Sequence, residues 1–180
     1  MSKFKTALYL ILLPCTALAG NNWNVILPGG NMRFQGEIIA EACRVEAGSR
    51  DMSVVMGQVS SNRFLATGYD AKSVPFNISL LDCSASVSRT VNISFYGVAD
   101  VRNPELLSIG EGNGVASGVA LAIFNEKNQL IPVNSNVDSL MYVPEKGPLS
   151  LRFIAKYRST APYVTGGAAN AQALFSLTYN

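Results

Sequence analysis

The sequence predicts an all-β fold in one domain, arranged as an antiparallel sandwich. Apolar and polar residues alternate with a period of two over several segments, and no long segment has a helical period. Clusters of Gly, Pro, Asn, Asp and Ser, such as Asn103-Pro104 and residues 145–148, separate these segments and are typical of turns. A chain of 180 residues is long enough to bury a sizeable core. Many short strands at this spacing favour a sandwich of immunoglobulin-like type.

Four internal segments carry the strand signal. In residues 74–80 every second residue is apolar, and residues 91–95 repeat this pattern before Gly97. Residues 115–124 form an almost continuous apolar run, which is expected of a strand covered on both faces. Residues 149–157 again alternate between apolar and polar side chains. Each segment is therefore predicted to be a strand of the sandwich.

The last ten residues alternate without interruption up to Asn180. One face of this segment carries only apolar or aromatic side chains: Ala171, Ala173, Phe175, Leu177 and Tyr179. Chain ends usually carry polar, dispensable sequence. The pattern predicts a final strand that runs to the terminal carboxylate.

The first residues have the features of a secretion signal. Lys3 and Lys5 precede a short apolar run at residues 7–13, and Ala17-Leu18-Ala19 supplies the small residues that signal peptidase requires. The apolar run is shorter than the roughly 20 residues that span a bilayer. We therefore expect residues 1–19 to be a cleaved signal peptide, with cleavage after Ala19 or Gly20, and no direct membrane anchor.

Cleavage leaves two cysteines, Cys43 and Cys83. In an exported protein an even number of cysteines favours a disulfide bond. A pair of buried free thiols is the alternative.

The composition argues against catalysis and nucleic-acid binding. The chain has no histidine, which removes the commonest general base and a frequent zinc ligand. The formal net charge is +2, and it falls to zero once Lys3 and Lys5 are removed. Pairs of acids such as Glu37 and Glu41 arise by chance on a protein surface, and residues 110–114 lack the Lys-Ser/Thr of a phosphate-binding loop. We expect no catalytic residues, no metal site and no cofactor.

The segment between the signal peptide and the first cysteine is unusually apolar. It contains Val25, Ile26 and Leu27, and further along Gly30, Met32 and Phe34 share one face of an extended stretch. A glycine on such a face marks a place where another backbone approaches closely. The segment is either the first strand of the domain or an extension that adds a strand to another molecule.

Several motifs, in this order and spacing, resemble the subunits of chaperone–usher pili, specifically the type 1 fimbrial pilins. These are residues 29–37 leading to Cys43, residues 57–59, residues 75–78 leading to Cys83, residues 95–100, and a C-terminal pattern with Gly167 fourteenth from the end and a penultimate Tyr179. The similarity covers essentially the whole chain after the signal peptide. It implies an incomplete immunoglobulin-like (pilin) sandwich, completed by a donor strand from a partner.

The resemblance also assigns roles to residues. Residues 20–35 would be an N-terminal donor-strand extension and residues 36–180 the pilin domain. The donor side chains would be Val25, Ile26, Leu27, Gly30, Met32 and Phe34, with the register near Pro28 left open. The strand bound by the chaperone would present Ala171, Ala173, Phe175, Leu177, Tyr179 and the carboxylate of Asn180. The expected partners are a periplasmic pilus chaperone, an outer-membrane usher and neighbouring pilin subunits, and the expected location is the cell-surface pilus, reached through the periplasm.

Within this family, three segments most resemble a minor, fimbrin-like accessory subunit: Trp23-Asn24, residues 27–30 and residues 153–158. We therefore expect a minor or assembly-terminating subunit of a type 1-like adhesive pilus. A major rod pilin is the alternative. A sugar-binding tip component is a weaker one, because 161 residues leave no room for a receptor domain in front of the pilin domain.

Overall fold

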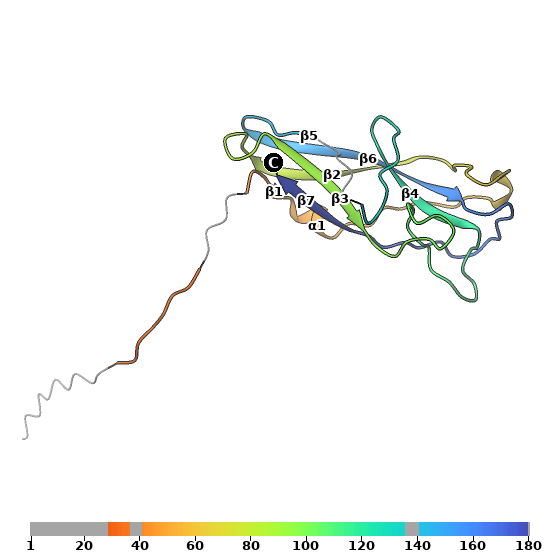
Figure 1. Ribbon diagram of the computed structural model, residues 1–180, viewed down its shortest axis with the longest axis horizontal. Coiled ribbons are helices and arrows are strands. Elements are labelled where there is room, and N and C mark those ends of the chain that lie inside the picture. The colour runs from red at the N-terminus through yellow and green to blue at the C-terminus, as the bar shows by residue number, and fades with distance from the viewer. Residues whose placement is uncertain (1–28, 37–40, 136–140, 180) are drawn as a thin grey trace, which may run out of the picture. The chain divides into compact units, whose positions relative to one another are not determined.

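The computed structural model describes residues 29–36, 41–135 and 141–179 (Figure 1). The chain divides into two compact units, residues 1–37 and residues 38–180. In the first unit the described residues, 29–36, form neither helix nor strand and are exposed. All helices and strands of the described residues lie in the second unit.

The larger sheet of the domain has four antiparallel strands in the order β1-β2-β6-β4. These are β1 (Arg44–Val45), β2 (Val74–Cys83), β6 (Gly147–Ser159) and β4 (Val119–Asn125). The second sheet has the order β5-β3-β7, formed by β5 (Met141–Tyr142), β3 (Thr90–Tyr96) and β7 (Leu174–Tyr179). The two short helical turns of the described chain are α1 (Ala47–Arg50) and η1 (Ser61–Arg63). The prediction of an all-β sandwich is confirmed.

The core lies between the two sheets and is built by the predicted alternation. Phe76 of β2 and Phe153 of β6 are cross-strand partners, and their ring centroids are 5.5 Å apart. Phe95 of β3, in the other sheet, meets the Phe153 ring edge-on at a centroid distance of 5.3 Å. Phe95 thus packs edge-to-face on both rings of the larger sheet, which is a geometry that aromatic quadrupoles favour.

The segment predicted as a strand over residues 115–124 begins later, at Val119. Gly118 stops the strand because its φ of +73° is a left-handed conformation that side chains disfavour. A side chain there would also collide with the carbonyl oxygen of Tyr163. Before it, Ser117 pairs instead with Thr165, and their hydroxyls lie 2.7 Å apart. An apolar run alone cannot reveal this change of partner.

The last strand also begins later than predicted. β7 starts at Leu174, and residues 171–173 are extended chain outside any strand. Ala171 is half-buried and packs against the main core. It therefore faces inward as predicted, although its backbone is not paired in a strand. The alternation fixes which side chains point inward, whereas pairing requires a neighbouring strand.

The outer face of the larger sheet carries a buried cation. Lys156 is 7% exposed and lies 3.7 Å from the carboxylate of Asp70 and 4.3 Å from the centroid of the Phe124 ring. Its Nζ also donates to Asn128. Arg158 donates two hydrogen bonds to the same Asp70 carboxylate, at 2.6 and 2.9 Å. A buried charge requires such pairing, and Asp70 thereby attaches the loop before β2 to β6.

Among the described residues, no helix is long and apolar enough to cross a membrane. The same part of the chain contains no cluster of three or more His, Cys, Asp or Glu side chains able to hold a metal ion.

Candidate functional site

The last strand of the domain has one unpaired edge. β7 pairs with β3 from Val91↔Tyr179 to Tyr96↔Leu174, and within the described chain no strand pairs with its other edge. On the facing sheet β1 is the terminal strand, paired only with β2 at residues 80 and 81. The sandwich is therefore open between β1 and β7.

A groove of about 530 Å³ lies at this opening. Its lining residues come from both edges of the sandwich: Glu41, Cys43, Val45, Arg50, Ala173, Leu174, Phe175, Leu177 and Tyr179. Phe175, Leu177 and Tyr179 are only half-buried, and together with Val45 they pack against the main hydrophobic core. Apolar core side chains next to unpaired backbone make a site for an added strand, which supplies both hydrogen bonds and apolar cover.

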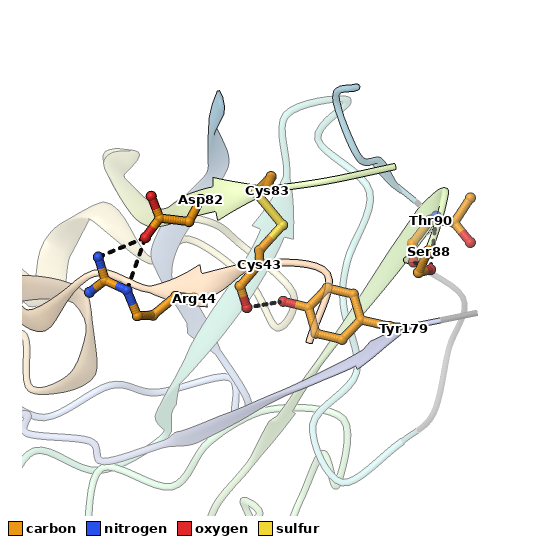
Figure 2. The surroundings of a disulfide bond; sticks show 7 residues. All are labelled: Cys43, Arg44, Asp82, Cys83, Ser88, Thr90 and Tyr179. Atoms are coloured by element: carbon orange, nitrogen blue, oxygen red, sulfur yellow. Dashed lines mark hydrogen bonds and ion pairs between the residues drawn. A yellow bond between two sulfur atoms is a disulfide. The ribbon is translucent and has the colours of Figure 1, made fainter. Parts of the chain in front are cut away.

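The predicted disulfide anchors one wall of the groove. Cys43 and Cys83 are bonded to each other, which confirms the predicted pair, and both are almost fully buried. Figure 2 shows the bond beside the exposed ion pair between Arg44 and Asp82, whose atoms are 2.9 Å apart. The bond attaches the chain just before β1 to the end of β2.

One hydrogen bond crosses the groove. The hydroxyl of Tyr179 donates to the carbonyl oxygen of Cys43 at 3.1 Å (Figure 2). Burial raises the pKa of Tyr179, and the negative charge of Glu41 raises it further. The hydroxyl therefore stays protonated, and able to donate, at neutral pH.

The structure brings most of the predicted C-terminal residues to this groove. Ala173, Phe175, Leu177 and Tyr179 line it, whereas Ala171 packs on the core and is not among the lining residues. Asn180 lies outside the described residues. Of the predicted donor residues, Gly30 is exposed, Met32 is 79% exposed and Phe34 is 86% exposed. Val25, Ile26 and Leu27 lie outside the described residues.

The other wall of the groove was not predicted from the sequence. Val45 continues the alternation that begins at Cys43, so its position could have been found from the pattern. Glu41 and Arg50 carry no sequence signal that would place them here, because their position depends on where β1 lies against β2. The alternation of the last strand places Leu174 on the face opposite Phe175, yet Leu174 also lines the groove, where it is 77% exposed.

Comparison with known proteins agrees with this architecture. A family model described as "Fimbrial protein" matches residues 32–180. The chain is 35% identical over 172 residues to the "Probable major fimbrial subunit LpfA" of Escherichia coli O157:H7, covering 94% of this chain and 96% of that protein. It is 36% identical over 159 residues to the "Putative fimbrin-like protein FimI" of Salmonella typhi, covering 86% and 88% of the two chains.

Among solved structures, one described as revealing the molecular basis of rod uncoiling in a chaperone–usher pilus superimposes with a TM-score of 0.64. It is 25% identical and covers 87% of this chain and 98% of its own.

Proposed function

The chain belongs to the fimbrial protein family and is a structural subunit of a chaperone–usher pilus at the cell surface, and from this premise we propose that it is the repeating subunit of the pilus rod. In this proposal the groove between β1 and β7 accepts the N-terminal extension of the next copy, which completes the sandwich.

The observation that carries the proposal is the unpaired edge of β7 beside half-buried core side chains. Residues 29–36 offer the complementary feature, since Met32 and Phe34 are large apolar side chains left exposed on one face of an extended stretch. Burying these two side chains would contribute about 3–6 kcal/mol together. That amount is a substantial part of the stability of a whole domain.

The chemistry of the groove also accounts for the proposed transport partners. An open edge over apolar side chains would aggregate if it stayed uncovered. We propose that a periplasmic chaperone covers Ala173, Phe175, Leu177 and Tyr179 until the usher replaces it with the extension of a neighbouring subunit. The carboxylate of Asn180 would bind basic side chains of the chaperone.

The number of copies decides between the rod and an accessory role. Relatives at similar identity include a major subunit and a fimbrin-like protein. The match to the major subunit covers more of this chain than the match to the fimbrin-like protein. We therefore propose the role of rod subunit in preference to the minor, assembly-terminating role that residues 153–158 suggest. Quantitative mass spectrometry of purified pili should find this chain in hundreds of copies per pilus. One or a few copies per pilus would refute the rod assignment in favour of the accessory role.

A melting experiment tests the groove itself. The exported chain alone should have low thermal stability, and a synthetic peptide of residues 23–36 should raise its Tm strongly. A peptide with Met32 and Phe34 both replaced by Ser is the matched control and should have little effect. A chain that is already highly stable and does not respond to the first peptide would rule out donor-strand completion.

A further inference from the structure

A turn shortly before β4 exposes the only Asn-Gly pair of the chain, Asn113-Gly114. The backbone N–H of Val115 donates to the carbonyl oxygen of Gly112 at 3.3 Å and closes the turn. Gly114 has a φ of +82°, which this position of a turn requires and which glycine adopts readily. Asn113 and the glycines on both sides of it are exposed, so the pair is accessible to water.

An asparagine followed by a glycine can react with its own backbone. The backbone nitrogen of the glycine attacks the side-chain amide carbon Cγ, and a five-membered succinimide ring forms. The N–Cγ bond forms and the Cγ–Nδ2 bond breaks. The backbone nitrogen gives its proton to solvent, and Nδ2 takes a proton from solvent and leaves as ammonia. Water then adds to one of the two ring carbonyl carbons and opens the ring to aspartate or isoaspartate.

The structure leaves both reacting groups free at this turn. Ring formation requires the peptide unit between Asn113 and Gly114 to rotate until its nitrogen faces Cγ. Within the described chain, no hydrogen bond holds the carbonyl oxygen of Asn113, its side-chain amide or the N–H of Gly114. A methyl group placed on Gly114 would have no atom within 4 Å. The rotation therefore breaks no hydrogen bond and starts in open space.

Other asparagines in turns have their side chains held. Asn134 is also exposed and precedes a small residue, Ser135. Its Oδ1 accepts from the N–H of Gly97 at 3.1 Å, and its Nδ2 donates to the carbonyl oxygen of Gly97 at 2.9 Å. An amide held in this way cannot turn toward the following backbone nitrogen without losing both hydrogen bonds. Asn134 is therefore an internal control for Asn113.

The turn also holds the segment that leads to β7. The carbonyl oxygen of Gly114 accepts from the N–H of Ala168 at 2.8 Å, and the carbonyl oxygen of Ala168 accepts from the N–H of Ala116 at 2.9 Å. Gly167 lies so close that a Cβ there would be 2.5 Å from the carbonyl carbon of Val115. In isoaspartate the main chain runs through the former side chain and gains one carbon just before Gly114. This close contact cannot accept a longer backbone without moving.

We propose that Asn113 is a site of spontaneous modification, converted to aspartate and isoaspartate by attack of the Gly114 nitrogen, and that the isoaspartate form loosens the contact of this turn with residues 165–168. Water is the only co-reactant, and no enzyme is required. Each conversion adds one negative charge to a chain whose formal net charge is zero without Lys3 and Lys5. The inference does not depend on the proposed donor-strand function.

An ageing experiment on the exported chain tests the reaction. The folded chain is kept at neutral pH, digested with trypsin and mapped by mass spectrometry. Conversion of Asn113 adds about 1 Da to the peptide of residues 103–127, and isoaspartyl methyltransferase detects the isoaspartate. Each rate is divided by the rate in a synthetic peptide, of residues 108–118 for Asn113 and of residues 129–139 for Asn134. Asn113 should react within about fivefold of its peptide, and Asn134 more than about fivefold more slowly, because its hydrogen bonds must break first.

Two variants separate the chemistry from its consequence. Asn113→Gln keeps the amide, but its ring would need six members, so it should stay unmodified over the same time. Asn113→Asp carries the added charge without the longer main chain. The aged fraction with the extra charge is separated by ion exchange, and hydrogen exchange is measured at the amides of Ala116 and Ala168. Exchange should be at least about fivefold faster than in the fresh chain, and less than about twofold faster in Asn113→Asp.

Each outcome supports or overturns the proposal. If Asn113 in the folded chain reacts more than about fivefold more slowly than in its peptide, the fold protects the pair and the proposal is wrong. If Asn134 keeps pace with its own peptide as Asn113 does, the reaction occurs through opening of the chain and not at this turn, which also overturns it. Equal exchange at Ala168 in the aged fraction and in Asn113→Asp would refute the loosening by isoaspartate.

Discussion

Two aspartates of this chain pair with arginine, one in a partly buried site and one on the exposed surface. The same substitution at both therefore measures how burial changes the contribution of an ion pair to stability. Asp70 accepts two hydrogen bonds from Arg158 and lies 3.7 Å from Lys156, whose side chain is 8% exposed. Asp82 pairs with Arg44, and their side chains are 73% and 53% exposed. The change to Asn keeps the shape of the side chain and removes its charge in both places.

We expect Asp70→Asn to lower the free energy of unfolding by about 2–3 kcal/mol. Removing one partner of a fully buried pair costs about 3–5 kcal/mol. The lower figure applies because the Asp70 side chain is 26% exposed and water replaces part of the lost interaction. Lys156 would keep only Asn128 and the face of Phe124 as neighbours for its charge. Asp82→Asn should cost about 0–1 kcal/mol, as exposed pairs do.

Urea denaturation followed by circular dichroism, with the groove filled by the peptide of residues 23–36, measures both changes under the same conditions. Raising the salt concentration should reduce the small effect at Asp82 and leave most of the effect at Asp70, because buried pairs are screened less. Equal losses in the two variants would contradict the assignment of Lys156 as a buried cation that depends on Asp70.

Three further predictions concern the groove, the disulfide and the buried Tyr157. Leu177→Asp should weaken binding of the peptide of residues 23–36 at least about thirtyfold in titration calorimetry, because it places a carboxylate under the added strand. The control Thr178→Asp, at the exposed neighbouring position, should change the affinity less than about threefold. Equal effects would mean that the peptide does not cover the face of β7 that carries Leu177. Cys83→Ser should lower the free energy of unfolding in urea by about 4 kcal/mol, since the bond joins residues 40 apart in sequence, and a loss below about 1 kcal/mol would show that it does little to limit the unfolded chain. Burial raises the pKa of Tyr157 above its ordinary value of 10.0, so the folded state binds this proton more tightly than the unfolded state. The free energy of unfolding that this difference contributes is fully present below about pH 10 and is lost as the pH rises through the folded pKa. Tyr157→Phe should therefore lose less stability than the unmodified chain between pH 9 and pH 11, and identical losses would refute the effect of burial.

The sequence predicted the sandwich, its main strands and the disulfide because each has a local signal. The alternation at residues 74–80 and 149–157 predicts which side chains face the core. In the structure Phe76 and Phe153, both on the predicted core face, are cross-strand partners. Strand limits were less accurate, because Gly118 and residues 171–173 depend on neighbours distant in sequence.

The groove was predicted on one side only. Its β7 wall has a repeating pattern, whereas Glu41 and Arg50 reach the site through the packing of β1 and α1 on the rest of the domain. No spacing in the sequence encodes such a contact, and the hydrogen bond from Tyr179 to Cys43, across 136 positions, is of the same kind.

The two walls of the groove come from opposite ends of the domain's sequence, and this has a consequence for how the protein is made. The groove therefore exists only in a chain that contains both Cys43 and Val45 on one wall and the residues from Ala173 to Tyr179 on the other. A chain shortened before Leu174 would lack β7 and, under the proposed function, could neither engage a chaperone through that strand nor receive a neighbour. Under the proposed function, the position of the groove therefore excludes shortened chains from the fibre.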